Sequence, residues 1–201
     1  MLSWINLPKA PHSRFLFLDR DGVINEDRPD YIRHWKEYRF YPDALDALRW
    51  LREHCVNVIL ISNQSALNRG ITGWKDFWEI HTRMIRRIEE AGGEILAAFY
   101  CPHHPDEKCD CRKPSPGMIL AAGKVYGIPL GDSHLIGDRH TDLLAASQAG
   151  CEGILLNRLT ENGAQSRTGP ESFQCSDKKF GNHGPYTNLV QAVTDIYGEK
   201  N

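Results

Sequence analysis

Two aspartates stand two residues apart directly after a short apolar run, and their type and spacing could do chemistry. Asp19 and Asp21 follow residues 15–18, and Gly22 comes next, where it allows a sharp departure of the chain. Side chains alternate along a strand, so we expect both carboxylates on one side of its carboxyl end. Such a repelling pair is retained where a cation lies between the acids or where they divide acid and base work. D-x-D-G alone more often marks a strand that ends in a polar turn, so the rest of the chain must decide.

Composition excludes several classes of protein. The chain has 201 residues, of which 41% are apolar and 25% charged, as in an ordinary globular protein with one sizeable core. A net charge of −2 gives no general attraction to nucleic acid or to an anionic membrane. No apolar run approaches the length that spans a membrane, and the first 14 residues do not read as a signal peptide. Three of the six cysteines lie within residues 101–111, which favours a metal site in a reducing compartment. We therefore expect a cytoplasmic protein with no nucleic-acid or membrane partner.

Apolar patterns along the chain alternate between strand and helix. Strands are expected at residues 15–18, 56–61, 95–100, 134–137 and 153–156. Helices are expected from Pro42, across Phe77–Ile88, at 116–126 and at 141–149. Such alternation predicts an α/β fold: a Rossmann-like, doubly wound, mostly parallel sheet with helices on both faces. In such sheets the ligand crevice lies beyond the carboxyl ends of the strands.

Polar groups follow four consecutive predicted strands. Asp19 and Asp21 follow the first strand, and the second is followed by Ser62, Asn63, Gln64 and Ser65. The cysteine-rich segment with Arg112 and Lys113 follows the third strand, and Asp138, Arg139 and Asp142 follow the fourth. A single such group could be a helix cap or a surface lysine. Four groups at four strand ends predict one site.

The order of these motifs resembles the haloacid dehalogenase-type phosphatase superfamily, over roughly residues 15–156. A phosphate monoester needs a nucleophile, a proton for the leaving oxygen and cationic compensation of charge. The resemblance implies that Asp19 is the nucleophile that forms an aspartyl-phosphate, and that Asp21 first protonates the leaving group and then activates water. Mg²⁺ would be bound by Asp19, Asp138 and the main-chain carbonyl of Asp21. Ser62 and Lys113 would hold the phosphoryl group, and Asp142 would orient Lys113 or a metal-bound water.

Residues 101–111 contain three thiols and two imidazoles. Cys101, His103, Cys109 and Cys111 can complete one tetrahedral Zn²⁺ site, with His104 as an alternative to His103. Buried cysteines beside a surface histidine would be the simpler interpretation, but two closely spaced ligand pairs disfavour it. Four protein ligands leave no position for water, so the zinc is expected to be structural and to fix the loop that presents Arg112 and Lys113.

The zinc loop followed by Arg-Lys-Pro resembles the histidinol-phosphatase and heptose-bisphosphate phosphatase branch of this superfamily. The five residues between His103 and Cys109 resemble histidinol phosphatases. Residues 63–70 (N-Q-S-A-L-N-R-G) and 113–118 (K-P-S-P-G-M) resemble heptose-bisphosphate 7-phosphatases, although Ala66 replaces a glycine of that pattern. The resemblance therefore implies Mg²⁺-dependent removal of the 7-phosphate from D-glycero-D-manno-heptose 1,7-bisphosphate, in the synthesis of the nucleotide-activated heptose used for lipopolysaccharide core. Histidinol phosphate is the alternative substrate.

Cationic and polar side chains around the predicted crevice are the candidates for substrate binding. Arg69, Arg112 and Arg139 exceed what one phosphate needs, and this surplus favours a bisphosphate over the cationic histidinol phosphate. The other candidates for substrate binding are Asp27, Asp30, Asn63, Gln64 and Ser65. Asp27 and Asp30 belong to a short flap at residues 23–41, and no large cap domain is expected.

The whole chain is expected to form one phosphatase domain and to be a monomer. Its core would cover residues 13–157, followed by a long loop or partly disordered stretch at 158–187 and a terminal helix at 188–198. Two other classes remain as alternatives. A zinc-containing nucleic-acid-binding module would need a basic stripe, and a non-catalytic zinc-containing binding domain would normally have lost Asp19 or Asp21. A phosphomutase is a third alternative and would need a cap to retain its intermediate and exclude water.

Overall fold

The computed structural model describes residues 1–158 and 185–198 and contains a six-stranded sheet. Its strand order is β1-β4-β3-β2-β5-β6, and all neighbouring pairs are parallel except β1 with β4. The strands are β1 (Leu2–Ile5), β2 (Arg14–Leu18), β3 (Val56–Asn63), β4 (Ala97–Cys101), β5 (His134–Gly137) and β6 (Glu152–Leu155). The predicted α/β class with a mostly parallel sheet is confirmed.

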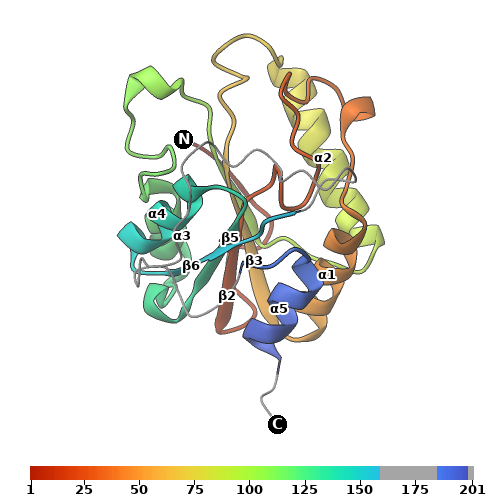
Figure 1. Cartoon of the computed structure of the whole chain (residues 1–201), viewed down its shortest axis with the longest axis vertical. Helices are drawn as coiled ribbons and strands as arrows, with labels where there is room; N and C mark the ends of the chain where they lie inside the picture. The colour runs from red at the N-terminus through yellow and green to blue at the C-terminus, as the bar shows by residue number, and fades with distance from the viewer. Residues whose placement is uncertain (159–184, 199–201) are drawn as a thin grey trace.

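Alternate residues of the central strands serve two apolar cores, one on each face of the sheet. In β2, Leu16 and Leu18 belong to one core, whereas Phe15 and Phe17 belong to the other. Helices α1, α2 and α5 cover the first face and α3 and α4 the second, as Figure 1 shows on opposite sides of the strands. The helices are α1 (Pro42–Glu53), α2 (Trp74–Glu90), α3 (Gly117–Tyr126), α4 (His140–Ala149) and α5 (Leu189–Tyr197). The sheet is therefore buried on both faces, as its near-continuous apolar strands require.

Two regions of the chain differ from or extend the sequence-based expectation. Strand β1 was not predicted, because four residues with an alternating buried and exposed pattern give a weak signal; it adds an antiparallel edge to β4. Between β2 and α1 the chain has no cap domain, only a 3-10 turn at Trp35–Glu37 and isolated bridges such as Asn25 with Phe40. Residues 159–184 of the predicted 158–187 loop lie outside the described residues. Residue Tyr186 bridges to Leu156.

The chain changes direction across the sheet between β2 and β5. Successive strands after β2 are added on its β3 side, and then β5 pairs with the other edge of β2. The main-chain amide of Asp19 donates to the Ile136 carbonyl at 3.0 Å and holds the two strand ends together. This change of direction lies beyond the carboxyl ends of β2 and β5, the place where doubly wound sheets bind ligands.

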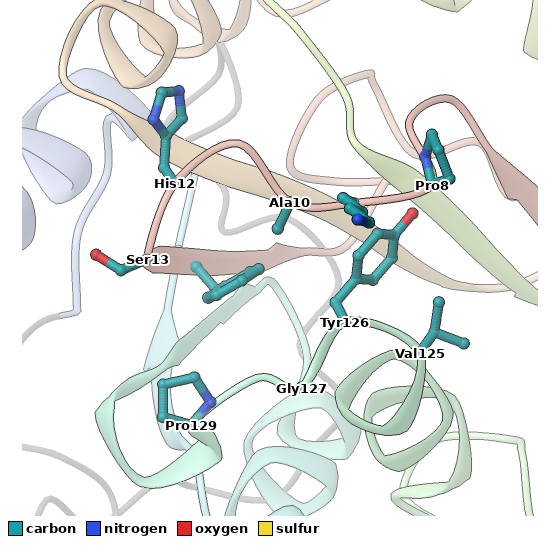
Figure 2. Close-up of a pocket in the computed structure, with 10 residues that line it drawn as sticks. Pro8, Ala10, His12, Ser13, Val125, Tyr126, Gly127 and Pro129 are labelled. Atoms are coloured by element: carbon teal, nitrogen blue, oxygen red, sulfur yellow. The ribbon is translucent and has the colours of Figure 1, made fainter.

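A separate hollow of about 400 Å³ lies at the opposite end of these strands. Figure 2 shows it between the segment before β2, with His12 and Ser13, and the chain after α3, with Gly127 and Pro129. It is remote from the polar strand ends and does not mark the candidate site. Among the described helices, none is both long and apolar enough to cross a membrane.

A buried ion pair ties the end of the sheet to two helices. Arg158 donates to Asp43 Oδ1 at 2.8 Å and to the Val23 carbonyl at 2.7 Å, and its guanidinium lies 3.9 Å from the centre of the Tyr41 ring. Asp43 Oδ2 accepts from the Leu189 amide at 2.6 Å. These contacts hold the first turns of α1 and α5 against the loop that follows Asp21.

Replacing Arg158 with methionine should destabilise the fold, because it leaves Asp43, whose side chain is only 13% exposed, without its charged partner. Breaking such a pair costs about 3–5 kcal/mol in the free energy of unfolding. Arg49→Met is the matched control, since Arg49 pairs with Asp46 at a similar 2.8 Å on an exposed surface and should cost below about 1 kcal/mol. Urea denaturation of both variants measures the difference, and equal losses would contradict the role given to Arg158.

Candidate active site

Three carboxylates and one lysine meet at the ends of β2 and β5. Lys113 Nζ lies 2.9 Å from Asp19 Oδ1 and 2.5 Å from Asp142 Oδ1, and it also donates to the Ile61 carbonyl at 2.9 Å. Asp138 stands directly after β5, and its carboxylate lies with those of Asp19 and Asp142 within 4.8 Å of one another. We call Asp19, Lys113, Asp138 and Asp142 the lysine–carboxylate cluster. The structure thus brings together four of the residues that the sequence assigned to the reaction.

The electrostatics of this cluster are those of crowded, buried acids. Burial raises the pKa of Asp19 to about 6, and nearby Lys113 opposes that rise. Burial, together with the charges of Asp19 and Asp142, raises the pKa of Asp138 well above its usual range. Burial alone would lower the pKa of Lys113, but Asp142 and Asp19 raise it. One lysine therefore does not compensate three carboxylates, and the cluster favours an additional cation.

The oxygen atoms of this cluster fit a hard divalent cation. Asp138 Oδ1 is buried and has no hydrogen-bond partner among the described residues, so it is free to coordinate. Unlike Asp138, Asp142 has a partner for each oxygen: Oδ1 contacts Lys113, and Oδ2 accepts from the Arg139 amide at 3.0 Å. Mg²⁺ prefers carboxylate and carbonyl oxygens and keeps several waters. The donor set therefore fits Mg²⁺ with Asp19 and Asp138 as the available carboxylates.

Two glycines allow the carboxylates to come this close. Gly22 has φ +83°, and a Cβ there would lie 2.2 Å from Asp138 Oδ2. At Gly137 a Cβ would lie 2.3 Å from the Cβ of Asp142. Any larger residue at either position would displace an acid of the cluster.

Asn63 positions the lysine through main-chain contacts. Its Nδ2 donates to the Lys113 carbonyl at 3.1 Å, and its Oδ1 accepts from the Lys113 amide at 3.1 Å. The Asn63 side chain thus makes the pair of hydrogen bonds to Lys113 that the main chain of a neighbouring strand would make. We expected Asn63 to bind substrate, but in the structure both of its polar atoms serve this loop.

Asp21 belongs to a second polar group, which also contains Arg20, Asn25, Ser62 and Gln64. Arg20 Nη2 lies 2.9 Å from both Asp21 oxygens, and Gln64 Nε2 donates to Asp21 Oδ2 at 2.7 Å and to Ser62 Oγ at 2.9 Å. Asn25 Nδ2 donates to Asp21 Oδ1 at 2.9 Å. Burial would raise the pKa of Asp21, but Arg20 and these hydrogen bonds lower it. Strand β2 ends at Leu18, so strand alternation does not govern how Asp19 and Asp21 point.

Cys101, His103, Cys109 and Cys111 form a compact cluster in the loop after β4. The sulfur of Cys101 lies 3.5 Å from that of Cys109, which lies 3.5 Å from that of Cys111, and His103 Nδ1 lies 3.3 Å from the Cys111 sulfur. The edges of a tetrahedron of zinc ligands are roughly 3.5–3.8 Å long, as follows from Zn–S and Zn–N bond lengths. The four atoms therefore have the spacing of a zinc site. His104 lies outside this cluster, where its Nδ1 accepts from the Asp106 amide at 3.3 Å.

The charged residues predicted to bind substrate lie on the segments that follow β2, β3, β4 and β5. Arg139 Nη2 is 2.6 Å from Asp27 Oδ2, so this pair joins the flap to the start of α4. Arg112 donates to the His103 carbonyl at 3.3 Å, and Asp30 pairs with Arg28 at 3.0 Å. Arg69 is exposed, in a loop where its amide donates to the Ser65 carbonyl at 3.0 Å. Ser65 itself is buried, like Gln64.

Ala66, which replaces a glycine of the heptose-bisphosphate phosphatase pattern at residues 63–70, has an ordinary backbone conformation. In the described chain the residues other than glycine with positive φ are Tyr31, Cys55 and Lys108, and Ala66 is not among them. Ala66 is buried, and its carbonyl accepts from the Ile71 and Thr72 amides. The loop at residues 63–70 therefore does not need a glycine at this position.

The sequence analysis missed Arg20 and Asn25. Both are buried against Asp21, and Arg20 is only 3% exposed. A signal was present, since an arginine between two acids next to a buried strand needs a charged partner.

The chain matches a family model and is similar to known phosphatases in sequence and in a solved structure. A sequence model of the HAD-hydrolase-like family matches residues 110–171. The D-glycero-beta-D-manno-heptose-1,7-bisphosphate 7-phosphatase of Pseudomonas aeruginosa is 40% identical over 141 residues, which are 70% of this chain and 79% of that protein. The protein of the same name from Helicobacter pylori is 36% identical over 170 residues, covering 83% and 94%. The crystal structure of the D,D-heptose 1,7-bisphosphate phosphatase from B. bronchiseptica, complexed with magnesium and phosphate, is similar with a TM-score of 0.70 and 38% identity, covering 71% and 80% of the two chains.

Replacing Gly22 with alanine should destabilise the protein more than the same change at Gly150, which has the matching φ of +85° and open space around it. Gly150→Ala should cost about 1 kcal/mol for a left-handed conformation. Gly22→Ala should cost a further ~1–3 kcal/mol, because the new methyl group overlaps Asp138. Urea unfolding curves for both variants provide the measurement; losses of the same size would show that the contact with Asp138 is not tight.

Proposed function

Because this chain belongs to the family of D-glycero-beta-D-manno-heptose-1,7-bisphosphate 7-phosphatases, which are haloacid dehalogenase-like hydrolases, we propose that it removes the 7-phosphate of such a heptose bisphosphate. The observation that carries this proposal is the lysine–carboxylate cluster at the switch point of the sheet. The loop sequences at residues 63–70 and 113–118 support the heptose substrate. The β-anomer is the substrate in the names of both relatives and is proposed here.

Asp19 is the proposed nucleophile. Both described donors to its side chain, Lys113 Nζ and the Arg20 amide, bind Oδ1, which leaves Oδ2 to attack phosphorus. A bond from this oxygen to phosphorus forms as the bond from phosphorus to the sugar oxygen breaks, and the product is an aspartyl-phosphate. Asp21 gives a proton to the departing sugar oxygen and then takes one from the water that hydrolyses the intermediate. Lys113 and Ser62 compensate and bind the oxygens of the transferring group.

Mg²⁺ is proposed to bind Asp19, Asp138 and the main-chain carbonyl of Asp21. The buried, unpaired Asp138 Oδ1 and the excess of carboxylates over lysine support this ligand set. When bound, the ion would neutralise charge on the phosphoryl group. Asp142 is proposed to orient Lys113, because both of its oxygens already have partners.

Zn²⁺ is proposed to bind Cys101, His103, Cys109 and Cys111. The spacing of the four ligand atoms and the closed set of protein ligands support a structural ion. Arg112 follows the cluster directly and contacts the His103 carbonyl, so a fixed cluster also fixes the start of the Lys113 loop. The thiols must stay reduced to bind zinc, and this supports a cytoplasmic location. We also propose that the protein is a monomer.

The second phosphate is proposed to lie against Arg69 and Arg112. Arg139 is less suited to this role, because Asp27 neutralises it at 2.6 Å. Ser65, Asp27 and Asp30 would line the sugar side of the crevice. Histidinol phosphate is the competing substrate, favoured by the five-residue spacing between His103 and Cys109. The pathway implied by the heptose substrate is synthesis of the lipopolysaccharide core precursor.

A substrate panel tests the proposed activity. We expect the β-anomer of the heptose 1,7-bisphosphate to exceed its α-anomer, histidinol phosphate and fructose 1,6-bisphosphate in kcat/KM by at least about tenfold, or about 1.4 kcal/mol. Asp19→Asn should reduce phosphate release on the order of a thousandfold or more, because the nearly isosteric amide is not a nucleophile. Preference for histidinol phosphate would replace the substrate assignment, whereas an active Asp19→Asn variant would remove the nucleophile assignment.

The two proposed metals should separate in a chelation experiment. A mild chelator should abolish activity, and added Mg²⁺ should restore it, because hard oxygen ligands hold this ion loosely with its waters. About one zinc per chain should remain through that cycle. Cys109→Ser should lose the zinc and lower the thermal unfolding temperature, whereas Cys55→Ser, at an exposed thiol outside the cluster, should do neither. Full activity and unchanged stability of a zinc-free protein would refute the structural ion.

A further inference from the structure

Arg20 is the most deeply buried charged group near the site that the proposed reaction does not use. It stands between the two acids of D-R-D-G, and its side chain is 4% exposed. A buried guanidinium is stable only where its charge and its donors are satisfied. The groups that satisfy the charge and the donors of Arg20 therefore indicate what this residue does.

Asp21 is the ion-pair partner found for Arg20 within the described residues. Arg20 Nη2 is 2.9 Å from each Asp21 oxygen, and Arg20 Nε is 3.2 Å from Oδ1. The aromatic and imidazole groups around the guanidinium supply no formal negative charge: Tyr100 Oη bonds to His81 Nδ1 at 2.8 Å, and Tyr38 is buried close by. Moving Asp21 away would leave a buried charge without its counter-ion, so Arg20 fixes where this carboxylate lies.

Gln64 completes the arrangement from the neighbouring strand end. Its Oε1 accepts from Arg20 Nη2 at 3.0 Å, while its Nε2 donates to Asp21 Oδ2 at 2.7 Å. The same Nε2 reaches Ser62 Oγ at 2.9 Å, and Ser62 is a proposed phosphoryl-binding group. One side-chain amide thus connects the position of the acid to that of the phosphate site.

We propose that Arg20, braced by Gln64, is a positioning residue that holds the Asp21 carboxyl group in register with the phosphoryl site for proton transfer to the leaving oxygen. The inference rests on the proposed phosphatase activity and adds to it a residue that does not itself touch the substrate. Its forked contact is with Asp21, and its other side-chain partner is Gln64, so most of its contribution to the rate should pass through Asp21. An arginine retained only to stabilise the fold would act on every substrate and in every background alike.

A double-mutant cycle separates these two roles. The variants are Arg20→Met, Asp21→Asn and both together, and kcat/KM is measured on an alkyl phosphate that the unmodified enzyme hydrolyses. We expect Arg20→Met alone to lower kcat/KM on the order of a hundredfold, and by less than about threefold once Asp21 is already asparagine, because effects that share one group are not additive. Arg20→Lys should recover part of the loss, since it restores the charge without the forked contact. Losses that multiply in the double variant would overturn the proposal.

The leaving group supplies a second readout. p-Nitrophenyl phosphate releases an anion that needs no proton, and kcat/KM includes only steps up to that release. We expect Arg20→Met to lower kcat/KM for this ester by less than about fivefold, far below its effect on the alkyl phosphate. Equal losses on both esters would overturn the proposal. If Arg20→Met does not fold, Arg20→Gln is put through the same cycle and must show the same pattern, and losses that multiply there would count against the role equally. Failure of the heptose bisphosphate as a substrate would be seen in the unmodified enzyme and would leave this comparison intact.

Discussion

Like-charge repulsion among three buried carboxylates, only partly relieved by one lysine, is the constraint on which the rest of the site depends. Lys113 reaches Asp19 and Asp142 directly, whereas Asp138 keeps an unpaired buried oxygen. Such crowding opposes folding unless the lysine is held in place and a cation is available. Gly22 and Gly137 leave room for the acids, because a side chain at either position would overlap Asp138 or Asp142. Asn63 helps to hold the lysine in place by pairing with the main chain of Lys113.

The two acids of D-R-D-G have different environments although only one residue separates them. Asp19 faces the lysine and two further acids, so its pKa rises to about 6, while Asp21 faces an arginine and two amides, so its pKa falls. The two carboxyl groups therefore have different pKa values because their surroundings differ, although both are aspartates. The arginine between the two acids is buried and pairs with the second of them.

The fold was predictable to a large extent because its signals are local. Apolar strands, amphipathic helices and polar residues after strand ends identified β2 to β6 and the parallel sheet. Strand β1 was not predicted, because four residues at an edge give too short a pattern and their pairing with β4 joins distant parts of the sequence.

The sequence also predicted which residue types lie near the site, but it did not predict which groups their side chains contact. Asn63 and Gln64 were expected to face substrate, whereas the structure uses them to hold Lys113 and Asp21. Side-chain amides at a strand end can point either way, and only the neighbouring loops decide.

The loops around the crevice are attached by contacts that are separate from the buried cluster. The four candidate zinc ligands lie together in the loop after β4, and Asp27 and Arg139 join the flap to α4. Thr72 donates to the Ile32 carbonyl and so joins the same flap to the loop before α2. Arg69, which is proposed to bind the second phosphate, is exposed and makes no side-chain contact with the buried cluster among the interactions found in the described residues. This separation has a physical reason. Transfer of a phosphoryl group needs groups held in one geometry in a dry environment, whereas recognition of a second, distant phosphate needs charges that water can reach before the substrate arrives. Within the described residues there is no large cap, so the proposed phosphatase would have to supply both from one sheet edge, with the first set buried and the second on loops.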